Sequence, residues 1–289
     1  MFFLLILVLM NLSFAVITVT KTAQNTDIFV EECRFISCST SLNGGAISVS
    51  NMRNVILNGC IFHRCSAQKW AGGVYCEIYS QKFELKRVCA YECHSGGNGH
   101  DGQFGVGKSG NTFEMKSVTV CRCYSNKLQG DNPIISSGQY GDSSNNNFSA
   151  NYVFNSDGSN SFHISFVQQN NNRYYNIVGN NGALNAIKIF GTYTKMTSEF
   201  FNIINNSMTS QAVNFTKYCT ISNFIFKGSG SVSTTFLTCK DCSINQNSIP
   251  TLGIIHLNTH ECYGTVTMTK SIRSINLQVF LFSYLCFYL

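Results

Sequence analysis

Short runs in which apolar and polar residues alternate recur along the chain, separated by clusters of Ser, Asn and Gly. Residues 54–62 are one such run, and a second short apolar run after it opens with Gly72 and Gly73. Alternation with a period of two is typical of β-strands, and these runs are too short for helices. The small polar clusters are typical of turns. The pattern therefore predicts an all-β chain built from many short strands.

The strand pattern repeats at a nearly constant spacing. Residues 33–38 and 60–65 each contain a cysteine, an aromatic residue and a second cysteine in the same order, and Gly44 and Gly72 lie 28 positions apart. Weaker copies follow further along the chain. Repeated short strands with no helix between them are typical of a β-solenoid, in which each repeat forms one coil.

Cysteines mark the first four copies of the repeat. Coils of a β-solenoid stack about 4.8 Å apart, so equivalent residues form ladders. We expect one ladder of Cys33, Cys60, Cys89 and Cys121, and the same copies also hold Cys38, Cys65, Cys93 and Cys123. Neighbours in such a ladder fall within the Cα separation that a disulfide tolerates, but a thiol is also a good small core group. We favour cysteines that are mostly buried and only partly in disulfides, and the pairing stays open.

The glycine motif resembles that of a known family. Gly-Gly-Ala-Ile, together with an aromatic residue three positions before a polar residue or cysteine, resembles the repeat of the polymorphic outer-membrane proteins (Pmp). The motif residues are Gly44, Gly45, Ala46 and Ile47, with a variant at Gly72, Gly73, Val74 and Tyr75. A literal Phe-x-x-Asn stands at residues 148–151, whereas Cys38 and Cys65 stand where the family has Asn.

The resemblance is clear over residues 29–79 and fades toward residue 260. It implies a right-handed parallel β-helix of the pectin-lyase-like class, which we expect to form one domain over residues 16–274. It also implies a surface-exposed, adhesin-like protein. Similar repeats occur in surface proteins of parasitic protists.

The N-terminus indicates a compartment. An unbroken apolar run fills residues 2–10, and Ser13 and Ala15 then match a cleavage site, so residues 1–15 are a predicted secretory signal peptide, with a buried first strand or helix as the alternative. The 14 cysteines fit an oxidising compartment. Asn147, Asn205 and Asn214 begin glycosylation sequons. We therefore expect a secreted or cell-surface protein.

Residues 275–289 form an apolar, aromatic tail. A membrane helix needs about 20 residues, and this tail is shorter and includes Asn276 and Gln278. Three interpretations stay open: a short membrane anchor, a cleaved lipid-anchor signal, or the apolar last coil of the rod.

Composition and motif context argue against several classes of site. A net charge of +6 is too weak to predict nucleic-acid binding, and 44% apolar residues argue against disorder. Residues 102–109 match the phosphate-binding pattern G-x4-G-K-S, but no buried strand precedes them and no helix start follows. Cys239, Cys242, His256 and His260 have zinc-finger spacing, but Pro250 stands near the start of the required helix. We expect no nucleotide, metal or other cofactor.

The expected function is binding. The 14 acidic residues are scattered, and no motif pairs two of them as glycoside hydrolysis would need, so we do not expect an enzyme. We expect an adhesin-like protein whose polar β-helix face binds glycans or cell-surface proteins. The alternatives are a carbohydrate-active enzyme with a degenerate site and a coat protein without a ligand. A cluster of carboxylates on one face would favour the enzyme.

Overall fold

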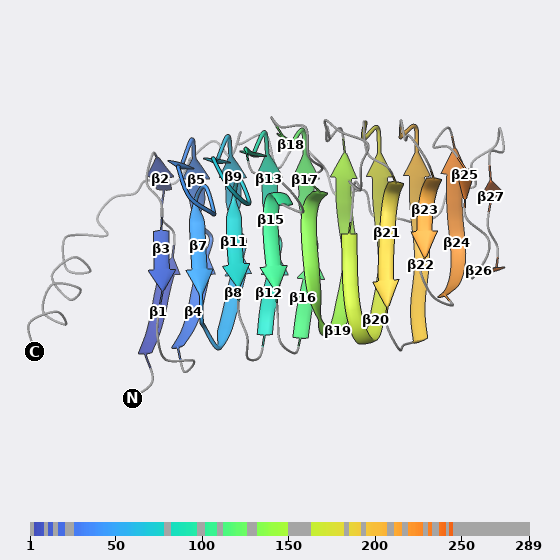
Figure 1. Ribbon diagram of the computed structural model, residues 1–289, viewed down its shortest axis with the longest axis horizontal. Coiled ribbons are helices and arrows are strands. Elements are labelled where there is room, and N and C mark those ends of the chain that lie inside the picture. Colours follow the sequence, from blue (N-terminus) through green and yellow to red (C-terminus); the bar gives the residue numbers. More distant parts are fainter. Residues whose placement is uncertain are drawn as a thin grey trace, which may run out of the picture.

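The chain folds as a parallel β-solenoid whose coils follow one another along a single axis (Figure 1). All strand pairs are parallel, and no helix occurs among the described residues, which confirms the predicted all-β parallel β-helix. The computed structural model describes residues 3–8, 11–13, 17–20, 26–77, 82–96, 102–108, 112–125, 132–149, 163–181, 185–191, 195–206, 211–215, 219–227, 231–232, 237–240 and 243–244.

The large sheet consists of three columns, each of which takes one strand or part of a strand from every coil. The first column contains β1 (Phe3–Val8), β4 (Thr26–Glu31), β8 (Asn54–Asn58), β12 (Lys82–Lys86) and β16 (Thr112–Lys116). It continues through the longer strands β19 (Asn132–Ser149), β20 (His163–Val178), β22 (Lys195–Ile204) and β24 (Cys219–Lys227), and ends at β26 (Leu237–Lys240).

The second column contains β2 (Asn11–Ser13), β5 (Arg34–Ile36), β9 (Ile61–His63), β13 (Cys89–Tyr91) and β17 (Thr119–Cys121), then the ends of β19, β20, β22 and β24, and β27 (Ser243–Ile244). The third contains β3 (Ile17–Thr20), β7 (Ile47–Ser50), β11 (Val74–Glu77), β15 (Gly102–Lys108), the starts of β19 and β20, β21 (Asn185–Gly191), β23 (Gln211–Phe215) and β25 (Ser231–Val232). A separate four-stranded sheet holds β6 (Ser39–Thr40), β10 (Ser66–Ala67), β14 (His94–Ser95) and β18 (Tyr124–Ser125).

The core runs along the axis, inside the columns. In β4 every second residue is buried, and in β8 the register partners of these residues, Val55 and Leu57, are buried as well. Aromatic rings stack from coil to coil: the rings of Phe35 and Phe62 lie 4.8 Å apart, and those of Tyr175 and Phe201 lie 4.6 Å apart. Each buried ring removes about 150–250 Å² from water, so these ladders are a main source of stability.

Each coil turns its corners at single residues with left-handed backbone conformation. Glu32, Gly59, Arg87 and Ser117 occupy the corner after the first column, with φ between 49° and 66°. This conformation costs a non-glycine residue about 1–2 kcal/mol. Hydrogen bonds between coils offset the cost, since Glu32 N donates to Asn58 O and Gly59 N donates to Lys86 O, at 2.8 Å and 3.0 Å.

The structure describes only part of the two predicted terminal segments. Residues 3–8 form the strand β1, paired in register with β4, whereas the burial of their side chains lies outside the described residues. Cleavage after residue 15 stays a prediction. The tail at 275–289 lies outside the described residues. Within the part of the chain that the structure describes, no helix is long and apolar enough to cross a membrane.

Candidate functional site

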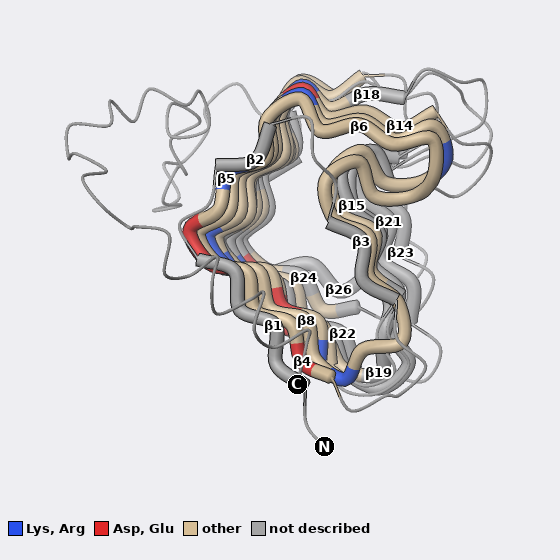
Figure 2. The backbone as a smooth tube through the Cα atoms, turned by 90° about the vertical axis from the view of Figure 1, so that its left-hand side faces the viewer, with Lys and Arg blue, Asp and Glu red and all other residues tan. Residues whose placement is uncertain are grey.

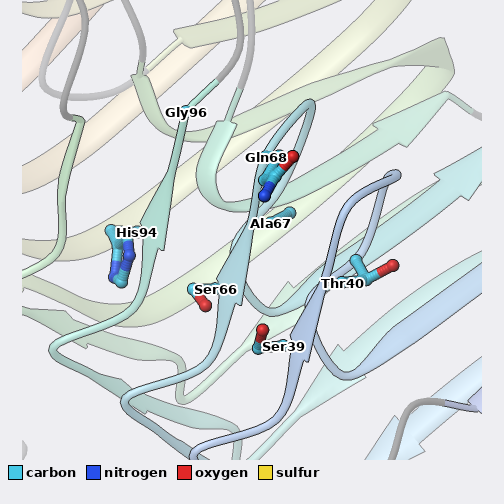
Figure 3. Close-up of a pocket in the computed structure, with 7 residues that line it drawn as sticks. All are labelled: Ser39, Thr40, Ser66, Ala67, Gln68, His94 and Gly96. Carbon is cyan, nitrogen blue, oxygen red and sulfur yellow. The ribbon is translucent and has the colours of Figure 1, made fainter.

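A small polar pocket lies on the four-stranded sheet. Each strand of this sheet follows a residue with positive φ at the end of the second column, which is Ser37, Arg64, Glu92 or Arg122. Because the coils are in register, Ser66 pairs with both Ser39 and His94. Figure 3 shows these three side chains in a row across β6, β10 and β14.

The pocket has a volume of about 250 Å³ and draws its lining from three successive coils. The lining residues are Ser39, Thr40, Ser66, Ala67, Gln68, His94 and Gly96. Hydrogen bonds between coils fix its walls, since Gln68 N donates to Thr40 O at 3.0 Å and Gly96 N donates to Ala67 O at 2.8 Å. Three hydroxyl groups and one amide are therefore held on a backbone that is itself hydrogen-bonded.

His94 contributes a neutral ring to this pocket. Burial lowers the pKa of His94 below its usual 6.5, because an imidazolium loses hydration there. At neutral pH the ring is uncharged, with one nitrogen that donates and one that accepts. The lining contains no Asp, Glu, Lys or Arg. The pocket thus offers uncharged donors and acceptors, which suits a ligand rich in hydroxyl groups.

The outer face of the first column carries a second cluster of polar groups. Glu84, Glu114 and Asp142 are register partners in three successive coils, so their carboxylates lie in one line. Lys82 Nζ lies 2.7 Å from Glu84 Oε2 and 3.0 Å from Glu114 Oε1. Lys116 Nζ lies 3.5 Å from Glu114 and 3.2 Å from Asp142. Figure 2, which looks along the stack, shows acidic and basic residues of successive coils close together beside β4 and β8.

Lys82 and Lys86 hold Glu84 in its charged form. Burial by itself raises the pKa of Glu84, but hydrogen bonds from Lys82 and Lys86 outweigh burial, and the net pKa is lowered. A glycoside hydrolase needs one carboxylic acid whose pKa is raised so that it can donate a proton. Glu84 has the opposite shift, so the cluster behaves as a self-neutralising ion-pair network.

The glycine motif packs the wall behind the pocket. Gly45 N donates to Ala71 O at 2.9 Å, and a Cβ on Gly45 would lie 1.9 Å from Gly72 O and 2.5 Å from Ser66 O. Gly44 adopts a φ of 68°. Ala46 N and Ile47 N then both donate to Gly73 O, and β7 pairs Ile47 with Val74 and Ser48 with Tyr75. Because Gly45 has no Cβ, its coil can pack closely against Ser66 of β10 and against Gly72 in the next coil.

The expected cysteine ladder is wrong at two of its four positions. The register aligns Cys33 with Cys60, but Cys89 pairs with Ile61, and Cys121 pairs with Tyr91. Val88 and Val118 instead continue the ladder of Cys33 and Cys60 inside the core. Cys89 is disulfide-bonded. The second cysteines of the copies do form one ladder, which consists of Cys38, Cys65, Cys93 and Cys123.

The sequons differ in exposure. Asn147 lies in β19 and is only 6% exposed, so a glycan does not fit on its side chain in this fold, and that expectation is corrected. Asn205 is exposed at a corner with a φ of 52°, and its glycosylation stays a prediction. Asn214 lies in β23, and its side chain is outside the described residues.

The structure describes the phosphate-binding pattern at residues 102–108 and one cysteine of the zinc-finger spacing. Gly102–Lys108 forms strand β15, which pairs with β11 and β19 and is not a loop before a helix. Cys239 lies in β26, whereas Cys242, His256 and His260 lie outside the described residues. Among the residues that the structure describes, no three metal-ligating side chains converge.

Sequence reasoning missed both the pocket and the charged cluster. The signal for the cluster is present in the sequence, because Glu84 and Glu114 lie 30 positions apart and Asp142 follows 28 positions later, which is one coil each time. Ser39, Ser66 and His94 each follow the second cysteine of a copy, so the repeat aligns them as well, but Ser and His are ordinary turn residues and do not indicate a pocket.

Comparison with known proteins gives no relative from which a function could be inferred. No protein-family model, no curated protein and no solved structure matches the chain. The structure itself shows a parallel β-solenoid with an uncharged polar pocket on one side.

Proposed function

We propose that this chain is a secreted or cell-surface, adhesin-like protein that binds glycans, with one sugar unit in the pocket of β6, β10 and β14. The observation that carries this proposal is the uncharged lining of hydroxyl, amide and neutral imidazole groups drawn from three coils. A sugar is uncharged and presents many hydroxyl groups that both donate and accept. Backbone hydrogen bonds hold the pocket in place, which lowers the entropy cost of binding.

The sequence motifs support the adhesin part of the proposal. The Gly-Gly-Ala-Ile repeat resembles that of the Pmp proteins, and in this chain it packs the wall next to β10. The predicted signal peptide would bring the chain to an extracellular glycan or glycoprotein, and the apolar tail at 275–289 would tether it there. The export by a signal peptide and the tethering by the tail are both parts of this proposal.

A carbohydrate-active enzyme is the second candidate, because Glu84, Glu114 and Asp142 share one face. Hydrolysis or elimination would then occur on the first column and not in the pocket. The lowered pKa of Glu84 argues against its acting as a proton donor. An assay for new reducing or unsaturated ends separates this candidate from binding alone.

The test uses the full chain on a glycan array, followed by analysis of the bound glycans for cleavage. Ser66→Trp fills the pocket with a large ring, and Ser144→Trp places the same ring on the outer face of the first column as a matched control. We expect the wild type and Ser144→Trp to bind the same glycans without cleaving them, and Ser66→Trp to lose them.

Equal binding by all three proteins would refute the assignment to the pocket. Cleavage of bound glycans would favour the enzyme. If the array retains no protein at all, the glycan proposal fails and the coat-protein alternative gains support.

A further inference from the structure

Four cysteines stand in one column inside the core. Ser39, Ser66, His94 and Tyr124 are register partners, so the residues just before them, Cys38, Cys65, Cys93 and Cys123, also lie at equivalent positions in four successive coils. All four are 0% exposed and are present as thiols. Neighbouring thiols of the column influence one another electrostatically, Cys65 with Cys38 and Cys93, and Cys93 with Cys123.

These thiols hydrogen-bond to the coil before them. Cys65 Sγ donates to Phe35 O at 3.4 Å, and Cys93 Sγ donates to Phe62 O at 3.6 Å. In each pair the acceptor is the residue three positions before the preceding cysteine of the column. Cys65 and Cys93 therefore make the same contact with the preceding coil.

Asparagine makes the same hydrogen bond to the preceding coil further along the solenoid. Asn180 Nδ2 donates to Phe148 O at 3.0 Å, and Asn206 Nδ2 donates to Ile177 O at 2.8 Å, from the position that continues the column. An amide thus makes the same contact at a shorter distance than a thiol. Hydrogen bonding alone does not require cysteine in the first coils. Cysteine adds two features that asparagine lacks, an apolar side chain that suits the core and the ability to form a covalent bond.

The spacing of the column suits such a bond. Register partners in adjacent parallel strands lie about 4.8 Å apart, which falls within the Cα range of disulfides. Each thiol can reach only the next one above or below. The pairing that uses all four joins Cys38 to Cys65 and Cys93 to Cys123.

We propose that this column is a disulfide site in which Cys38 joins Cys65 and Cys93 joins Cys123, so that each bond staples two neighbouring coils. The oxidant is a small-molecule disulfide such as oxidised glutathione. For each bond, two cysteine thiols and one oxidised glutathione give one protein disulfide and two molecules of reduced glutathione. Two electrons and two protons pass from the cysteines to glutathione.

The disulfides form during folding and not after the fold is complete. Burial raises the pKa of the Cys93 thiol well above its usual value. The thiolate is the reacting species in disulfide exchange, so a buried thiol of this kind reacts slowly. The staples form while the first coils assemble and the thiols still meet solvent.

The test is oxidative refolding of the full chain. Unfolded, reduced protein is refolded with oxidised glutathione, remaining thiols are alkylated, and peptides are mapped by mass spectrometry without reduction. We expect peptides that join Cys38 to Cys65 and Cys93 to Cys123. A second sample, folded under reducing conditions and then exposed to oxidised glutathione, should keep the four thiols.

Cys93→Asn is the matched variant, because asparagine holds this position in later coils and keeps the hydrogen bond. It should retain the bond between Cys38 and Cys65 and leave Cys123 as a thiol. The proposal is overturned if oxidative refolding leaves the four cysteines alkylated, or if they pair with cysteines outside the column. A dominant bond between Cys65 and Cys93 would overturn the pairing.

Discussion

Asn206 ties two coils together through three hydrogen bonds inside the core. Its Oδ1 accepts from the backbone N–H of Asn180 at 3.0 Å and from the side-chain amide of Asn180 at 2.9 Å. Its Nδ2 donates to Ile177 O at 2.8 Å. Asn206 is 2% exposed, so water has little access to the groups it satisfies.

Replacing Asn206 with Ala removes all three bonds at once. A buried polar group that loses its partner costs about 1–3 kcal/mol. Two backbone groups, Asn180 N–H and Ile177 C=O, lose this partner, so we expect the free energy of unfolding to fall by about 2–4 kcal/mol. Because the coils of a solenoid contact only their neighbours, the coils around Asn206 should open first.

The assay is urea denaturation followed by circular dichroism, with hydrogen exchange at the backbone N–H of Asn180 as a local probe. Asn206→Cys is the control, since cysteine in this column donates to the same carbonyl in earlier coils. It should recover part of the loss. A change in unfolding free energy within about 0.5 kcal/mol of wild type, the range of ordinary surface substitutions, would refute the reasoning. So would equal loss in the Ala and Cys variants.

Three further changes test other parts of the fold. Phe62→Ala removes a stacked, fully buried ring and should cost about 3–5 kcal/mol in urea denaturation, and a cost near zero would contradict the aromatic ladder. A hydrogen bond from Arg53 lowers the pKa of Asp27 below its usual 3.8, so this pair stabilises the fold above that pH and less as pH falls below it. Asp27→Asn should therefore lower the melting temperature more at pH 7 than at pH 2, and equal effects at both pH values would exclude this linkage. Gly45→Ala should prevent folding, as judged by circular dichroism, because its Cβ would lie 1.9 Å from a backbone oxygen. Gly179→Ala has no atom within 4 Å of its Cβ and bears only the cost of a φ of 64°, about 1–2 kcal/mol, so it should fold with reduced stability.

The sequence alone predicts the solenoid because its period appears twice, in the cysteine pattern and in the glycine pair. The inward positions follow from alternation, and Phe35 and Phe62 are fully buried and stacked. The close approach at the glycine motif also follows, since two adjacent glycines leave room for another backbone.

The ladder of first cysteines fails for a physical reason. Val88 and Cys89 are adjacent apolar residues, and either could point into the core. A slip of one residue turns a side chain to the other face of a strand, so aligning Cys89 with Cys60 gives the wrong partner. The register is decided by the neighbouring residues of β12 and β13, which align over several pairs.

The repeat aligns the pocket residues but does not show that a pocket lies beside them. Ser39, Ser66 and His94 each follow the second cysteine of a copy and lie 27 and 28 positions apart, which is one coil each time. Glu84, Glu114 and Asp142 lie 30 and 28 positions apart, so the repeat aligns them to within two residues and the strand register then sets the pairing. Acidic residues that look scattered in the chain therefore form a line in the fold.

The salt dependence of glycan binding tests the central claim most directly. The full chain is titrated with the best glycan from the array at low salt and at 1 M NaCl. Because the pocket lining is uncharged, we expect nearly the same Kd in both solutions and one binding site per chain. Exposed charges are strongly screened at 1 M salt. A large loss of affinity at high salt would place the ligand on the charged face of the first column and contradict the pocket.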